Sequence, residues 1–351
     1  MKKITCDGIT FDDVLLIPQK TTVNSRSEIE IAGHITPKIK LETPIVSANM
    51  DTVTESRMAI AMAEVGGMGF IHRFLSIEDQ VAEVSLVKKL KLRVGAAIGV
   101  KDDYLARAEA LIKAKVDVLL IDVAHGHSNQ LLKVLKKIKT TYPKIEVIAG
   151  NIATAEAAEE LIKNGADALK VGIGPGSLCT TRIVTGAGVP QITAIMECLK
   201  AAEKTHTPII ADGGIRYSGD IVKALAAGAS TVMIGSMLAA CDESPALMVK
   251  KGDKQYKLTR GMASIAANLD RMKKDGHIKK DLEEYAQEGV EGMVPYRGSV
   301  TSLIKKMASG IRSGFSYCGS KNLVELWNNS QFVKISYSGL IESHPHDIEM
   351  V

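Results

Sequence analysis

The chain has 351 residues and a formal net charge of +4, from 44 Lys and Arg against 40 Asp and Glu. The 46% hydrophobic and 24% charged shares exclude a disordered chain, and the length is ample for a buried core. A charge this close to neutral gives no basis for a nucleic-acid-binding surface, and no apolar stretch reaches the roughly 18 residues of a membrane helix. The five cysteines are scattered without a CxxC pair, which favours reduced thiols. We therefore expect a cytoplasmic enzyme that binds neither nucleic acid nor a membrane.

Eight short apolar runs follow residue 40, and most gaps between them have a helical pattern. The runs are near-continuous rather than alternating, which is typical of parallel strands buried on both faces. The predicted strands are 44–48, 67–71, 94–100, 116–122, 145–150, 168–173, 208–211 and 231–234, and the predicted helices include 103–114, 129–140, 154–164 and 218–227. This pattern predicts an α/β fold, a (β/α)₈ TIM barrel. A doubly wound open sheet is the alternative, although no G-x-G-x-x-G follows an early strand.

Two segments lie outside this alternation of strands and helices. Residues 1–43 form an N-terminal arm, and residues 250–299 are a long, charged, weakly apolar insertion. Loops of that length in a compact domain are usually functional lids. We therefore predict one catalytic domain over residues 1–351, with a mobile active-site flap at 250–299.

Polar residues follow most of the predicted strands. In a β/α barrel the active site lies at the C-terminal ends of the strands, so these side chains should converge on one rim. The residues that we expect there are Asn49, Asp51, His72, Asp122, Asn151, Asp212 and Ser236.

The sixth strand leads into GIGPGSLCTTR at 172–182. Its three alternate glycines leave backbone amides and carbonyls exposed, which suits an anion or a ring of carbonyl ligands for a cation. The loop also brings Cys179 to the rim, where basic neighbours would favour the thiolate. A free cysteine is usually a small core residue, but at the tip of this loop we predict a nucleophile.

The seventh and eighth strands end in Asp212-Gly213-Gly214 and Gly235-Ser236. Barrels often hold a phosphate on backbone amides at this place, and Asp212 is suited to ribose hydroxyls. These features predict a phosphorylated substrate attacked by Cys179. A flavin-linked barrel oxidoreductase and a non-catalytic nucleotide-binding protein are the alternatives.

Four segments carry a family resemblance that covers nearly the whole chain. NMDTVTE at 49–55, the cysteine loop, ADGGIRYSGDIVKALAAGA at 211–229 and ESHPHD at 342–347 are similar to the IMP dehydrogenase/GMP reductase family. The resemblance implies a barrel that assembles as a homotetramer and a purine nucleotide, GMP or IMP, attacked at C2 by Cys179. The tandem regulatory domain that most dehydrogenases insert after the second strand is missing, because only one helix's length separates Ile71 from Val94.

The resemblance also assigns roles residue by residue. The implied catalytic residues are Cys179, Thr181 and Glu288, and the implied substrate-binding residues are Asp212, Gly213, Gly214, Gly235, Ser236, Arg260, Gly261, Met262 and Gly289. The implied cofactor-binding residues are Ser25, Arg26, His72, Asp122, Val123, Ala124, Gly172, Ile173 and Gly174. Carbonyl groups of Gly174, Gly176 and Cys179 would hold a potassium ion.

The choice between the two branches depends on the flap. The dehydrogenase branch activates water with an adjacent Arg-Tyr pair, whereas this chain has Asp270-Arg271-Met272 with no tyrosine beside the arginine. That difference favours the reductase, which converts GMP to IMP and ammonia with NADPH, and Arg26 suits the extra phosphate of NADPH. Dehydrogenase-like segments such as Arg216-Tyr217-Ser218-Gly219-Asp220 oppose it. The alternative is therefore an IMP dehydrogenase that uses NAD and takes Thr181 and Glu288 as its base.

Overall fold

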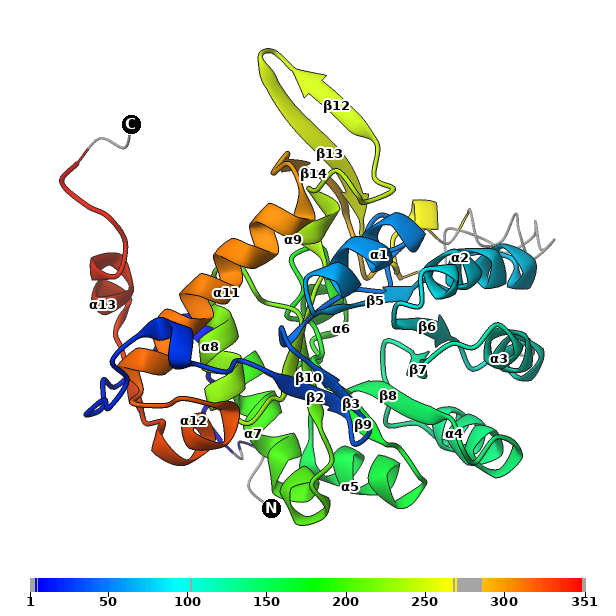
Figure 1. Ribbon diagram of the computed structural model, residues 1–351, viewed down its shortest axis with the longest axis horizontal. Coiled ribbons are helices and arrows are strands. Elements are labelled where there is room, and N and C mark those ends of the chain that lie inside the picture. The colour runs from blue at the N-terminus through cyan, green and yellow to red at the C-terminus, as the bar shows by residue number, and fades with distance from the viewer. Residues whose placement is uncertain (1–3, 5, 102, 268, 270–285, 349–351) are drawn as a thin grey trace.

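The chain folds as a closed barrel of eight parallel strands surrounded by helices (Figure 1). The computed structural model describes residues 4, 6–101, 103–267, 269 and 286–348. The barrel strands are β4 (Ile45–Ser47), β5 (Met68–Ile71), β6 (Val94–Ile98), β7 (Val118–Asp122), β8 (Glu146–Ile152), β9 (Ala168–Val171), β10 (Ile209–Asp212) and β11 (Thr231–Ile234). They pair in chain order, and β11 pairs with β4 to close the ring. The predicted TIM barrel is confirmed, and closure excludes the doubly wound sheet.

Helices on the outside of the barrel connect successive strands. They are α1 (Ser56–Glu64), α2 (Ile77–Lys89), α3 (Tyr104–Lys113), α4 (Asn129–Thr141), α5 (Ala155–Lys163), α7 (Gln191–Ala202), α8 (Ser218–Ala226) and α11 (Val300–Tyr317). Short helices are η1 (Phe11–Asp13), η2 (Arg26–Glu28), α6 (Thr181–Thr185), η3 (Glu203–Thr205), α9 (Ser236–Ala239), α12 (Leu323–Asn329) and α13 (Tyr337–Glu342). Local signals set the ends of α5: Thr154 accepts a hydrogen bond from the Ala157 amide, and Gly165 has a φ of +98°.

Alternate residues of each strand point into and out of the barrel. The inner set includes Val118, Leu120, Ala168 and Ile210, whereas Leu169 packs with the helices outside. The hairpin of β2 (Gly33–Thr36) and β3 (Ile39–Leu41) covers the N-terminal end of the barrel with its own apolar residues. Glu146 fixes this plug, because its carboxylate accepts hydrogen bonds from the Thr36 hydroxyl at 2.7 Å and the Lys38 amide at 3.2 Å. The opposite end of the barrel is left for the site.

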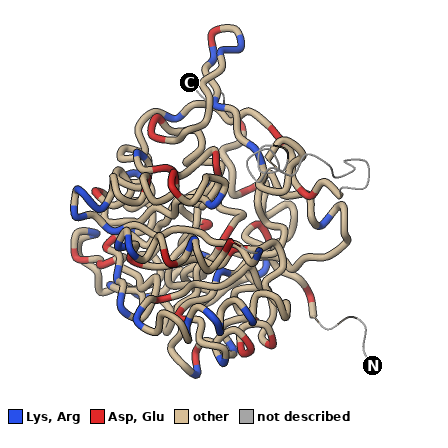
Figure 2. Tube along the Cα trace, turned by 90° about the vertical axis from the view of Figure 1, so that its right-hand side faces the viewer, with Lys and Arg blue, Asp and Glu red and all other residues tan. Residues whose placement is uncertain are grey.

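The remaining strands lie outside the barrel. β1 (Val14–Leu16) of the N-terminal arm pairs with β15 (Phe332–Lys334). Within the predicted flap, β13 (Lys254–Arg260) pairs with both β12 (Met248–Lys251) and β14 (Glu291–Pro295), and the β12–β13 hairpin projects beyond the barrel (Figures 1 and 2). The part of the flap at 270–285, with Arg271, lies outside the described residues. No helix in the described part of the chain is long and apolar enough to cross a membrane.

The barrel interior leaves no room for a side chain at Gly95 of β6. A Cβ there would lie 2.3 Å from Cε1 of the fully buried Phe70. We expect Gly95→Ala to lower the free energy of unfolding by about 1–3 kcal/mol, the usual effect of overpacking. Chemical denaturation monitored by circular dichroism would measure it.

Gly219 of α8 provides the matched control for this substitution. It is exposed, and a Cβ at this position would meet no atom within 4 Å. Gly219→Ala should therefore leave stability unchanged or raise it by up to about 1 kcal/mol. Equal effects of the two substitutions would contradict the packing of the barrel interior.

Candidate active site

A cavity of about 620 Å³ opens at the C-terminal ends of the barrel strands. This volume is within the usual range for small-molecule sites. Most residues predicted for the site line it: Asp122, Val123, Ala124, Gly172, Ile173, Gly174, Gly176, Cys179, Thr181, Asp212, Gly213, Gly214, Gly235, Ser236, Gly261, Met262 and Glu288. The fold therefore brings together residues that are up to 166 positions apart, as the barrel topology predicts.

Cys179, Thr181 and Glu288 form a short hydrogen-bonded chain. The Cys179 thiol donates to Oγ1 of Thr181 at 3.1 Å, and the Thr181 hydroxyl donates to Oε2 of Glu288 at 2.8 Å. The backbone holds the two segments in place, because the Thr180 amide donates to the Glu288 carbonyl at 3.0 Å. A nucleophile linked through a hydroxyl to a carboxylate is an arrangement that moves protons to and from a reacting group.

The glycines of the cysteine loop are required by their close contacts. Gly172 has a φ of +152°, and a Cβ there would lie 2.1 Å from the Asp212 carbonyl oxygen. Gly174 has a φ of +81°, and its Cβ would lie 2.6 Å from Cγ of Arg182. Arg182 supports the loop by donating from Nε to the Ile173 carbonyl at 3.2 Å. The loop therefore packs directly on the end of β10.

The donor set for a potassium ion consists of backbone oxygens. The Gly176 carbonyl already accepts a hydrogen bond from the Cys179 amide at 3.0 Å, which leaves its second lone pair for a cation. Neutral carbonyl oxygens are the ligands that potassium takes in proteins. No cluster of His, Cys, Asp and Glu suited to another metal occurs among the residues that the structure describes. The chemistry of the loop therefore fits the predicted ion.

Lys170 is the main feature that the sequence reasoning missed. Its side chain is 4% exposed, and its ammonium lies 2.8 Å from Oδ1 of Asp122 and 2.5 Å from Oδ2 of Asp212. Asn49 donates to the other Asp122 oxygen at 2.8 Å, and Asn151 donates to Asp212 at 2.9 Å. The sequence did contain a sign of this cluster, because Lys170 is a lysine within an otherwise apolar, buried strand. Such a residue needs charged partners.

The two carboxylates stabilise the charged form of Lys170, and Lys170 in turn stabilises the charged form of Asp122. Burial acts to lower the pKa of Lys170, but the Asp122 and Asp212 carboxylates raise it above its ordinary value. Burial likewise acts to raise the pKa of Asp122, but Lys170, Asn49 and Arg73 bring it below its ordinary value. The ammonium and the Asp122 carboxylate are therefore both ionised at neutral pH.

The glycine turns after β10 and β11 form another wall of the cavity. Gly213 and Gly214 have φ angles of +96° and +81°, which favour glycine. The hydroxyls of Ser177 and Ser236 are hydrogen-bonded to each other beside these turns. Ser177 was not among the predicted residues, although it lies in the cysteine loop. Hydroxyls and glycine amides together are typical of a phosphate site.

The N-terminal arm reaches the cavity at an unpredicted place. Thr10, Phe11 and Asp12 line it, and Asp12 forms an ion pair with Arg216. The predicted arm residues Ser25 and Arg26 instead lie on exposed η2 and do not line the cavity. Sequence alone did not show which part of the arm folds back onto the barrel.

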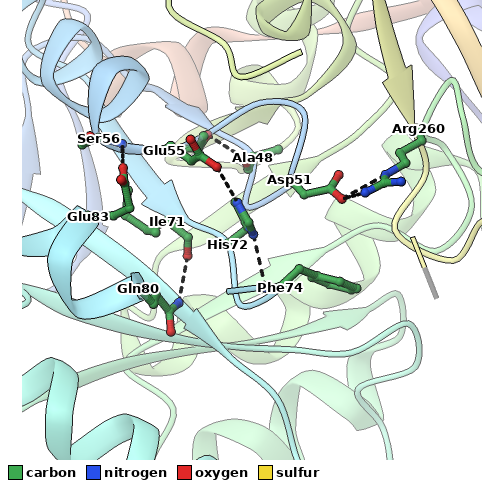
Figure 3. A network of polar contacts seen from close by, with 11 residues as sticks. Ala48, Asp51, Glu55, Ser56, Ile71, His72, Phe74, Gln80, Glu83 and Arg260 are labelled. Carbon is green, nitrogen blue, oxygen red and sulfur yellow. Dashed lines mark hydrogen bonds and ion pairs between the residues drawn. The ribbon is translucent and has the colours of Figure 1, made fainter. Parts of the chain in front are cut away.

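Three further predicted residues do not line the cavity, and Figure 3 shows two of them, Arg260 and His72. Arg260 donates from Nε and Nη2 to Oδ2 of Asp51 at 2.9 and 2.6 Å, just before Gly261 and Met262. His72 is buried, accepts a hydrogen bond from the Phe74 amide and lies 3.4 Å from Glu55. Gly289 pairs with Cys179 in an isolated β-bridge. These residues support the wall, and a direct role for them stays a prediction.

Comparisons with known proteins identify the same group throughout. A family model described as "IMP dehydrogenase / GMP reductase domain" matches residues 8–346. Inosine-5'-monophosphate dehydrogenase from Borreliella burgdorferi is 45% identical over 399 aligned residues, covering 99% of this chain and 98% of that protein. The Cryptosporidium parvum dehydrogenase is also 45% identical, covering 98% and 96%. The Nitrosopumilus maritimus dehydrogenase is 39% identical over a longer alignment of 469 residues.

A solved structure gives a close match of fold. It is a cysteine-to-alanine variant of GMP reductase from Trypanosoma brucei, in complex with guanosine 5'-monophosphate. It is 34% identical, with a TM-score of 0.93 over 98% of this chain and 99% of that chain. In the present chain, only α2 lies between β5 and β6, in agreement with the missing insertion.

The cysteine thiols differ in their exposure to solvent, so their rates of chemical modification test the geometry of the site. Cys179 is partly exposed on the cavity wall, whereas burial raises the pKa of Cys198 and Cys318 and raises that of Cys241 to about 12. In a Cys6→Ser background, iodoacetamide at pH 8 should modify Cys179 at least about 100-fold faster than these three thiols. Peptide mass spectrometry over time would measure the rates, and Cys179→Ala in that background is the control without the fast site. Uniform labelling of all four cysteines would contradict the assigned geometry.

Proposed function

Because the chain belongs to the IMP dehydrogenase/GMP reductase family, we propose that it oxidises IMP to XMP with NAD⁺ and water. The main support is the 45% identity to two dehydrogenases over nearly the whole length of both chains. This reverses the order of the two branches expected from the flap, where the missing tyrosine favoured the reductase. Family membership itself establishes a purine nucleotide oxidoreductase that uses a nicotinamide cofactor.

The relay supports a covalent mechanism in two steps. The Cys179 thiol first loses its proton to solvent, Sγ of the thiolate forms a bond to C2 of IMP, and the hydrogen at C2 leaves with its electron pair. NAD⁺, when bound, supplies the acceptor for that hydride. Water then adds to C2, the bond from carbon to sulfur breaks, and XMP leaves. Thr181 and Glu288 take the proton from the water, since the Thr181 hydroxyl lies between the thiol and the carboxylate.

The cavity offers a separate place for each part of the nucleotide. We assign the phosphate to the amides of Gly213, Gly214, Gly235 and Ser236, and the ribose hydroxyls to Asp212. The purine would then lie against Gly261 and Met262, which pack beside the cysteine loop. Arg260 acts through Asp51 in holding this segment. Such positioning of C2 near Sγ is the main contribution that a rigid wall makes to the rate.

The cofactor lies on the other side of the cysteine in this proposal. Asp122, Val123 and Ala124 line one wall, and Gly172 to Gly174 line the adjacent one. NAD⁺ is preferred to NADPH because Arg26, the residue that suited an extra phosphate, is not among the residues that line the cavity. A potassium ion on the carbonyls of Gly174, Gly176 and Cys179 would stiffen the cysteine loop.

A homotetramer is part of the same proposal. Ile183 of α6 is 86% exposed and Leu247 before β12 is 70% exposed, which are unusual fractions for large aliphatic residues. Ile183 follows the cysteine loop directly. Burial of such residues against a neighbouring subunit would fix the loop as well as assemble the enzyme.

GMP reductase is the second candidate, and two observations favour it. The solved relative with a TM-score of 0.93 is a GMP reductase with its nucleotide bound. The chain also lacks a tyrosine beside Arg271, which lies outside the described residues. The same relay serves this reaction, because Thr181 and Glu288 can deliver a proton to the leaving ammonia.

Absorbance at 340 nm separates the two reactions. We expect a rise with IMP and NAD⁺ in potassium chloride and no fall with GMP and NADPH. Chromatography of the nucleotides should show XMP as the product of the first mixture. A fall in the second mixture alone would establish the reductase, and Cys179→Ala in both mixtures controls for contaminating activity.

Thr181 provides a test of the relay. Thr181→Val removes the hydroxyl but keeps the shape, so we expect the steady-state rate to fall about 100-fold or more through slow hydrolysis. Hydride transfer should be slowed much less, which rapid mixing would detect as a burst of NADH. Thr181→Ser keeps the hydroxyl and should retain most of the activity. Equal slowing of both steps in Thr181→Val would contradict the relay.

A further inference from the structure

We propose that Lys170 is a positioning residue that couples the nucleotide subsite to the cofactor subsite through one shared ammonium group. The inference rests on the proposed function, in which Asp212 faces the ribose and Asp122 faces the cofactor. Lys170 lies 2.8 Å from one carboxylate and 2.5 Å from the other, so neither can shift without affecting it.

The strand register explains how one lysine reaches both carboxylates. Asp122 of β7 is opposite Gly150 of β8, and Gly150 is opposite Lys170 of β9. All three therefore lie in one row across neighbouring strands. A Cβ at Gly150 would lie 2.3 Å from the Lys170 carbonyl oxygen and 2.7 Å from its Cβ, so only glycine fits beside Lys170. Asp212 ends β10, on the opposite side of β9.

Two amides fix the cluster from outside. Asn49 holds the Asp122 oxygen that Lys170 does not contact, and Asn151 holds the same Asp212 oxygen that Lys170 contacts. Among the described residues, the side-chain hydrogen bonds of Asp212 all go to Oδ2, which leaves Oδ1 for ligand hydroxyls. The ammonium and the Asn151 amide therefore hold one oxygen of this carboxylate while the ligand uses the other.

The charges around the cluster determine what its removal does. Asp122 from β7, Asp212 from β10 and Arg73 after β5 are the charged groups that face it, while Asn49 and Asn151 are neutral. Without Lys170, the pKa of Asp122 would rise, because burial raises it and the ammonium that lowers it would be gone. The cavity would then carry an extra negative charge at high pH and lose it as the pH falls.

Equilibrium binding tests the coupling without requiring turnover. We would measure dissociation constants of IMP, GMP and NAD⁺ for the wild type and Lys170→Met between pH 5 and 9. At pH 8 we expect nucleotide and cofactor each to bind about tenfold more weakly to Lys170→Met, within the usual range of coupling between sites. The ratio of variant to wild-type constants should shrink as the pH falls. Ionisation of the nucleotide phosphate cancels in that ratio.

Lys139→Met is the matched control. Lys139 of α4 also donates to a carboxylate, Asp167, at 2.7 Å, but it lies at the opposite end of the barrel. Its substitution should leave all three dissociation constants within about twofold, since it touches neither subsite. If the ratio of the Lys170→Met dissociation constants to the wild-type constants does not change with pH, Lys170 has a purely structural role and the proposal is overturned.

Asp122→Asn tests the coupling in a protein that keeps Lys170. Loss of that carboxylate turns the ammonium wholly toward Asp212, where it competes with ribose hydroxyls. We expect IMP and GMP to bind at least about threefold more weakly, although Asp122 faces the cofactor. Unchanged nucleotide affinity would overturn the proposal, even where Lys170→Met does not fold. If the binding constants show the coupling but the wild-type protein does not oxidise IMP, the proposed reaction is wrong and the coupling stands.

Discussion

The two carboxylates at the mouth of the barrel can be held side by side only because an ammonium group lies between them. Below this level the inward side chains are apolar, including Leu120, Ala168 and Ile210. Without that ammonium, the pKa of the Asp122 carboxyl would rise in such surroundings, and its protonation would remove an acceptor from the site. Lys170 prevents this, and the amides of Asn49 and Asn151 leave the cluster little freedom to move. Glycine is required at position 150 beside this cluster, since a Cβ there would lie 2.3 Å from the Lys170 carbonyl oxygen.

The sequence predicted the barrel well because its signal is local and repeated. Each barrel strand is buried on both faces, so each is a short apolar run, and the predicted ends differ from the observed ones by two residues at most. Helix ends were equally visible, as with Thr154 and Gly165 at the ends of α5. The alternation of strand and helix then left few topologies, since crossover connections place parallel strands in order around a sheet. Polar residues after the strands had to converge for the same reason.

Contacts between distant segments were less accessible from the sequence. The pairing of Lys170 with Asp122 and Asp212 depends on register, which no single segment reveals. The ion pair of Arg260 with Asp51 joins residues 209 positions apart, so the arginine was assigned to the substrate rather than to the wall. The placement of Glu288 beside Thr181 was implied only by the family resemblance, and the geometry now gives it a physical basis. The direct site roles of these residues remain predictions.

The features that separate the dehydrogenase branch from the reductase branch lie in different parts of the chain. The relay joins the cysteine loop on the rim of the barrel to Glu288 of the insertion, where the Thr180–Glu288 hydrogen bond and the Cys179–Gly289 bridge hold it, and it suits proton transfer in either direction. The missing tyrosine concerns the insertion at 250–299, and long surface insertions can change in length and sequence at little cost to the fold. A base can therefore come from another position, such as Glu288, without disturbing the barrel. The alignment at 45% identity covers 99% of this chain and so spans the rim as well as the insertion, which is why it outweighs one absent side chain.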